Sequence, residues 1–114
     1  MPESPPRVSV LVISDYGGRR SEDWEYLRAT LTGLREQTFD EPFDAALVDA
    51  APPGEAMPPD VAELLPGLRI VRDPGATSCQ LLNGAIEAAP GDLVALLDGD
   101  CAPVRGWLAA GVAC

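Results

Sequence analysis

The chain has 114 residues, 46% of them hydrophobic, which is enough for one folded domain and too few for two. Its 18 acidic and 8 basic residues give a formal net charge of −10. This balance argues against nucleic acid as a partner, because nucleic-acid binding rests on Lys and Arg that neutralise phosphates. It also argues against docking to an anionic membrane surface. An acidic protein that binds an anionic ligand usually does so through a divalent metal ion.

Two residue types are missing from the sequence. There is no His, and all eight cationic residues are Arg, so there is no Lys. These absences exclude imidazole-based catalysis, imidazole metal sites, lysine Schiff bases and the phosphate-binding lysine of a P-loop. Any chemistry must therefore use carboxylates, a metal ion, hydroxyls or backbone groups.

The cysteines and the apolar runs indicate a cytoplasmic protein. Cys79, Cys101 and Cys114 are odd in number and have no CxxC spacing, so we expect reduced thiols. The polar, Pro-rich stretch Met1–Arg7 is not a signal peptide. The longest apolar run, Leu93–Leu97, is far shorter than the ~18 residues of a membrane span. A membrane anchor in a longer parent chain stays open.

The first half of the chain alternates strand and helix patterns. Val8–Ile13 is a nearly unbroken aliphatic run, typical of a strand buried on both faces. A polar turn follows, and then a helix with Ser21 as its N-cap. Phe43–Val48 is a second strand, which ends at Asp49. The helix has one apolar stripe that we expect to pack on the core, formed by Trp24, Leu27, Leu31 and Leu34.

The second half continues the alternation. After a Pro-rich loop, Asp60–Leu65 predicts a short helix and Leu68–Val71 a third strand. A longer helix is expected over Thr77–Ala89, and Leu93–Leu97 is a fourth strand. The face of the longer helix that we expect to be packed carries Cys79, Leu82, Ile86 and Ala89.

This alternation predicts an α/β fold, a Rossmann-like and mostly parallel sheet flanked by helices, in a single domain over residues 1–114. The first and fourth strands are apolar on both faces, so we expect them to be adjacent and central. Ligands of such sheets bind beyond the carboxyl ends of the strands. The residues expected there are mostly acidic, which favours a metal-assisted site: Asp15, Tyr16, Asp49, Asp73, Asp98 and Asp100.

The sharpest feature is Asp98-Gly99-Asp100, which directly follows the fourth strand. Two carboxylates separated by a glycine can face one cation, and the glycine lets a bulky ligand approach the backbone. Such hard oxygen ligands suit Mg²⁺ or Mn²⁺. As a bare tripeptide, D-G-D is also compatible with an acidic turn.

Motifs along nearly the whole chain resemble the family 2 glycosyltransferases, in the order and at the spacing of that family. They are Arg7–Ile13 followed by Tyr16; Leu31, Leu34 and Gln37 of an L-x-x-L-x-x-Q pattern; Asn83, Ile86, Ala89, Gly91 and Asp92 of an N-x-G-I-x-x-A-x-G-D stretch; and Leu96–Pro103 followed by Gly106-Trp107-Leu108, similar to F-L-D-x-D-x-x-P and W-L.

The resemblance implies the amino-terminal, nucleotide-sugar-binding portion of a GT-A fold, which would use Mg²⁺ or Mn²⁺ to bind a UDP- or GDP-linked sugar. It implies Asp100 as a direct metal ligand, and Asp98 as a second ligand or a ribose contact. Asp49 would meet the nucleotide base, and Tyr16 would line the base pocket. The nucleotide loops depart from the family pattern, since Gly17 replaces the Asn of P-x-Y-N and Ala50 follows Asp49.

The general base and the acceptor pocket of the family lie well after the metal motif, and residues 101–114 are too few to form them. We therefore assign no catalytic residue and expect a truncated domain. The alternative function is a non-catalytic or degenerate nucleotide-binding or interaction module. Two other classes of protein fit the sequence less well. A phospho-receiver domain would need a lysine, which this sequence lacks. A sugar-phosphate nucleotidyltransferase would need a Gly-rich, basic first loop, and the first loop here has that character only in part.

Overall fold

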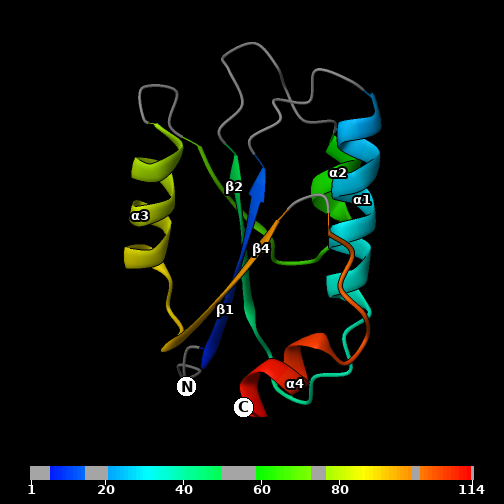
Figure 1. Ribbon diagram of the computed structural model, residues 1–114, viewed down its shortest axis with the longest axis vertical. Helices are drawn as coiled ribbons and strands as arrows, with labels where there is room; N and C mark the ends of the chain where they lie inside the picture. Colours follow the sequence, from blue (N-terminus) through cyan, green and yellow to red (C-terminus); the bar gives the residue numbers. More distant parts are fainter. Residues whose placement is uncertain (1–5, 15–20, 50–58, 73–76, 99–100, 114) are drawn as a thin grey trace.

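A computed structural model describes residues 6–14, 21–49, 59–72, 77–98 and 101–113 (Figure 1). Every strand and helix expected from the sequence is present, with bounds that differ by one or two residues. A further helix covers Trp107–Ala113. The elements are β1 (Val8–Ser14), α1 (Ser21–Arg35), β2 (Asp44–Asp49), α2 (Pro59–Glu63), β3 (Arg69–Val71), α3 (Ser78–Ala88), β4 (Leu93–Asp98) and α4 (Trp107–Ala113).

The described strands form one parallel sheet in the order β3-β2-β1-β4. Helix α3 covers one face, and α1 and α2 cover the other (Figure 1). The start of α3 is fixed by a capping box, in which the Thr77 side chain accepts from the Gln80 N–H and the Gln80 side chain accepts from the Thr77 N–H. The fold is therefore the predicted α/β arrangement, with a parallel sheet between helices.

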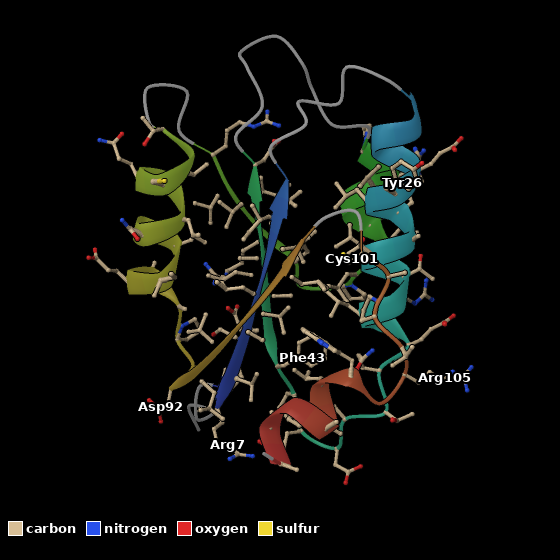
Figure 2. All side chains as sticks on the ribbon, viewed as in Figure 1. Arg7, Tyr26, Phe43, Asp92, Cys101 and Arg105 are labelled. Atoms are coloured by element: carbon tan, nitrogen blue, oxygen red, sulfur yellow. The ribbon has the colours of Figure 1, made fainter. Side chains whose placement is uncertain are left out.

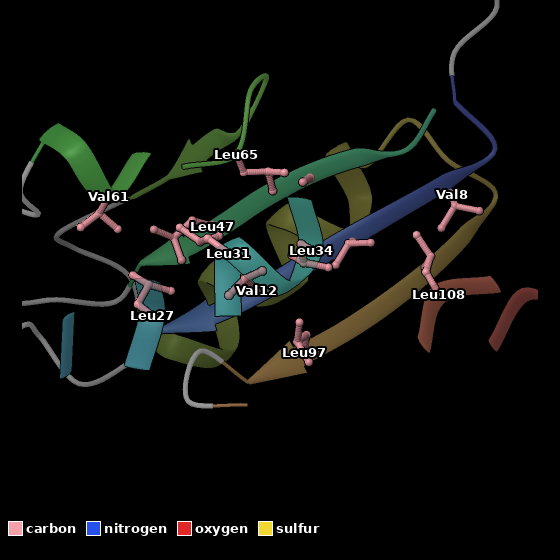
Figure 3. Close-up of a cluster of buried hydrophobic side chains, with 12 residues drawn as sticks. Val8, Val12, Leu27, Leu31, Leu34, Leu47, Val61, Leu65, Leu97 and Leu108 are labelled. Atoms are coloured by element: carbon pink, nitrogen blue, oxygen red, sulfur yellow. The ribbon is translucent and has the colours of Figure 1, made fainter. Parts of the chain in front are cut away.

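The core has two parts because β1 and β2 bury both of their faces. The larger part lies between the sheet and α1, where alternate residues of β1 pack on the apolar stripe of α1 (Figure 3). The smaller part lies under α3 and consists of Leu11, Ala46, Val48, Leu81 and Ala85. The predicted stripe of α1 is confirmed at Leu27, Leu31 and Leu34, each at most 1% exposed. The side chain of Trp24 lies outside the described part.

The structure corrects the expected position of the fourth strand. β4 is adjacent to β1, as expected, but it forms the edge of the described sheet. Leu93, Val94 and Leu96 are 43%, 38% and 49% exposed. An apolar run indicates that both faces of a strand can be buried. It does not show that the strand has a neighbouring strand on each side.

The structure also corrects the packed face of α3. Leu81 and Ala85 are buried, whereas Cys79 and Ile86 are exposed and Leu82 is half-buried. Successive residues of a helix are about 100° apart around its axis. The buried face with Leu81 and Ala85 is therefore next to the expected face with Leu82 and Ile86. Leu81 and Ala85 pack against Leu11, Ala46 and Val48 of the sheet.

Candidate functional site at the carboxyl edge of the sheet

Strand β1 and its two neighbours define the carboxyl edge of the sheet. Ser14 of β1 is in register with Asp49 of β2, and Ile13 is in register with Asp98 of β4. Neighbouring strands are about 4.8 Å apart, so β1 separates the two aspartate backbones by about 10 Å. The fold thus brings the backbones of two expected site residues to one edge, on the strands that flank β1.

Asp49 is a buried acid at this edge, with 2% of its surface exposed. The Arg72 guanidinium donates from Nη2 to Oδ2 of Asp49, and the Arg72 side chain is 37% exposed. A buried carboxylate needs such a cation and hydrogen bonds to offset its lost hydration. The ion pair ties the end of β2 to the residue after β3 and fixes the Asp49 carboxylate in place.

Arg72 is the residue of this edge that the sequence analysis missed. The expected site residue after the third strand was Asp73, which lies outside the described residues. The position of Arg72, directly after an apolar strand, is the signal that could have identified it.

The remaining expected site residues are only partly within the described part of the chain. Asp98 is the last residue of β4, and its backbone is described but its side chain is not. Asp100, Tyr16 and Asp15 lie outside the described residues. Cys79 and Cys101 are exposed and lie outside any disulfide of the described residues, and Cys114 lies outside the described part.

The donor set of this edge fits a divalent cation by its chemistry. The side chains within the described part include no group of three or more potential metal ligands. The carboxylates of Asp98 and Asp100 fall outside that part, and they are the hard oxygen donors that Mg²⁺ and Mn²⁺ prefer. The described backbone of Asp98 ends the strand beside β1, at the same edge of the sheet as Asp49.

A cavity of about 500 Å³ lies at the opposite, amino end of the sheet. Two carboxylates line it, and each is bound through both oxygens by an arginine. Arg7 donates to Glu41 at 3.2 and 2.6 Å, and Arg69 donates to Asp44 at 2.8 and 2.6 Å. Because both acids already have cationic partners, this cavity is poorly suited to a metal ion.

A smaller cavity of about 230 Å³ lies beside β4 and α4. Its lining is apolar and includes Leu93, Val94, Trp107 and Val112. It offers no charged side chain to a phosphate or a metal ion. No helix within the described ranges is long and apolar enough to cross a membrane.

Comparison with known proteins places the chain in a family. The model of glycosyl transferase family 2 matches residues 19–113. No curated protein matches significantly. Among solved structures, S. aureus TarS is similar, with a TM-score of 0.68 and 21% sequence identity. The match covers 94% of this chain and 19% of the TarS chain, so the chain spans about a fifth of that protein's length. The chain therefore belongs to glycosyl transferase family 2, with the fold of the amino-terminal portion of a GT-A domain.

Proposed function

We propose that this chain is the donor-binding portion of a glycosyltransferase. It binds a nucleotide-diphosphate sugar at the carboxyl edge of the sheet, through Mg²⁺ or Mn²⁺ at Asp98 and Asp100. The observation that carries the proposal is the parallel register, in which Asp49 and the first residue of D-G-D end the two strands that flank β1. The family match supports glycosyl transfer as the reaction class.

Asp49 recognises the nucleotide base in this proposal. A carboxylate accepts hydrogen bonds, and uracil and guanine both present a ring N–H that can donate one. A UDP- or GDP-linked sugar meets this requirement. Arg72 orients the acid through their ion pair. Tyr16 lines the base pocket.

Asp100 is the direct metal ligand, and Asp98 is a second ligand or a ribose contact. When bound, the metal ion supplies Lewis-acid stabilisation of the leaving nucleoside diphosphate. The net charge of −10 makes binding depend on the cation. At ~4 Å, two like charges repel by about 1 kcal/mol in water and about 4 kcal/mol at an effective dielectric of 20.

The acceptor and the general base are not assigned to residues of this chain. A general base must come within hydrogen-bond reach of the acceptor hydroxyl, and the acids of the proposed site already contact the donor or the metal ion. The odd number of cysteines and their lack of CxxC spacing favour a reducing, cytoplasmic location.

Calorimetry with UDP and GDP, each in Mn²⁺ and in EDTA, tests the proposal. We expect binding in Mn²⁺ and at least a tenfold weaker affinity in EDTA. Asp100→Ala should abolish the metal-dependent part, Asp98→Ala should weaken it less, and Asp15→Ala should change little. Asp92→Ala is the matched control, because this exposed acid directly precedes β4 rather than following it.

Two results would refute parts of the proposal. Equal affinity in Mn²⁺ and EDTA, or full affinity in Asp100→Ala, would mean that D-G-D is an acidic turn. Absence of binding in every condition would favour the non-catalytic interaction module and leave the fold unaffected.

A further inference from the structure

The segment between D-G-D and α4 runs along the carboxyl-terminal part of α1 (Figure 1). Gln37, two residues after α1, binds this segment. The Gln37 side chain donates from Nε2 to the carbonyl of Val104 at 2.6 Å and to the carbonyl of Gly33 at 3.1 Å. Its Oε1 accepts from the backbone N–H of Leu108, in the first turn of α4, at 2.9 Å. One amide thus links α1, the segment and α4.

Two neighbours of Gln37 strengthen this contact. The backbone N–H and the hydroxyl of Thr38 both donate to the carbonyl of Arg105, at 2.9 and 3.2 Å. Gly33 lies against Pro103, where a Cβ would come within 2.8 Å of the proline Cδ and 3.0 Å of its carbonyl oxygen. A side chain at position 33 would therefore push the segment away from α1.

The described residues on either side of D-G-D are therefore held by different elements. On its amino side, Asp98 is in register with Ile13 of β1. On its carboxyl side, the contacts with α1 begin at Pro103, three residues after Asp100. Figure 2 labels Cys101 and Arg105, near the start and the end of the segment that runs beside α1.

We propose that Gln37 is a positioning residue for the metal motif. By holding the Val104 carbonyl, it fixes the described segment that follows D-G-D, on which the metal affinity of the motif depends. Mg²⁺ and related ions demand near-ideal ligand geometry, so a displaced anchor weakens their binding. The inference rests on the proposed metal-dependent binding of a nucleotide, and it assigns a role to a residue that touches neither ligand.

Two substitutions separate the bonds of Gln37. Gln37→Met has a similar volume and removes all three hydrogen bonds. Gln37→Glu retains an acceptor for the Leu108 N–H but loses the donors to Val104 and Gly33. Ser9→Ala is the matched control, because Ser9 Oγ accepts from the Gly91 N–H at 2.9 Å and so anchors the other end of β4.

The readouts are UDP affinity in Mn²⁺, stability to chemical denaturation and amide hydrogen exchange of residues 101–106. We expect both Gln37 variants to bind UDP at least tenfold more weakly and to exchange faster in that segment. Ser9→Ala should lose comparable stability with less than a twofold change in affinity. If Gln37→Met does not fold, Gln37→Glu provides the same test with the contact to α4 retained.

Wild-type affinity in either Gln37 variant, or a loss no greater than that of Ser9→Ala, would overturn the inference. If the wild-type chain does not bind UDP in Mn²⁺, the proposed function fails. Hydrogen exchange alone then tests whether Gln37 anchors residues 101–106. Unchanged exchange in Gln37→Met would then overturn the anchoring role, and faster exchange would support it.

Discussion

Strand β2 begins and ends with an aspartate, and an arginine binds each of them. At the amino end, the Asp44 side chain is 10% exposed and accepts two hydrogen bonds from Arg69. At the carboxyl end, the Asp49 side chain is 2% exposed and accepts a hydrogen bond from Arg72. Arg69 begins β3 and Arg72 directly follows it, so the two ion pairs tie the same two strands together at opposite ends.

The difference between the two ends lies in what surrounds the pairs. At the amino end, a cavity of about 500 Å³ lies beside two acids that arginines already bind. At the carboxyl end, the pair shares an edge with the first residue of D-G-D. The direction of the strands therefore indicates the candidate site better than cavity volume or the presence of an ion pair.

Replacing the two arginines should have the largest effect. Arg72→Met removes the cationic partner of the more deeply buried acid, and we expect it to lower the free energy of unfolding by about 2–4 kcal/mol. Arg69→Met should cost about 1–3 kcal/mol, because Asp44 is more exposed. Arg72→Met alone should also weaken UDP binding in Mn²⁺. Chemical denaturation and calorimetry measure both effects, and an equal loss of affinity in the two variants would contradict the comparison.

Neutralising the two aspartates should give an intermediate effect. Asp49→Asn keeps the size of the side chain but replaces a charged acceptor, so UDP affinity should fall roughly tenfold, which is about 1.4 kcal/mol. Asp44→Asn should leave the affinity unchanged. A matched pair of titrations in Mn²⁺ makes the comparison. If Asp49→Asn bound as tightly as Asp44→Asn, the base-recognition role of Asp49 would be lost.

The smallest effect should come from the exposed pair at the amino end. The hydrogen bond from Arg7 lowers the pKa of Glu41, against a partial offset from desolvation. A lowered folded-state pKa stabilises the fold above the ordinary Glu pKa of about 4.3, and this contribution is lost as the pH falls through the folded-state value. Glu41→Gln should therefore lower stability slightly at pH 7, with the difference from wild type disappearing in acid. A difference that persists or grows at low pH would contradict this assignment.

The sequence predicted the features that depend on neighbouring residues. The strands and helices follow from local apolar patterns, and the family assignment follows from contiguous motifs such as Leu96–Pro103. The edge position of β4 could not be predicted, because β1 and β4 have similar apolar runs. Within the described sheet, β1 pairs with a strand on each side, whereas β4 pairs with β1 on one side only. Burial on both faces is a property of the assembled sheet and cannot be deduced from one strand.

Contacts between residues far apart in the sequence could not be predicted either. The expected site included Asp49 but not Arg72, which lies 23 positions away and meets it because β2 and β3 pair in parallel. The bond from Gln37 to Val104 spans 67 positions. Gln37 was recognised as part of a motif, but its bonding partners emerge from the packing of residues 103–108 on α1.

The most direct test of the metal-dependent site is the location of Mn²⁺ in a complex with UDP, measured by paramagnetic broadening of backbone amide resonances. Mg²⁺–UDP provides the diamagnetic reference. Strands of this length span about 20 Å, so the broadening can distinguish an ion at one end of the sheet from an ion at the other. We expect broadening at Ile13, Asp49 and Cys101, at the carboxyl edge, and little at Glu41 and Gly67, beside the larger cavity. Broadening centred on Glu41 and Gly67, or the same pattern in Asp100→Ala, would contradict a metal-dependent nucleotide site at the D-G-D motif.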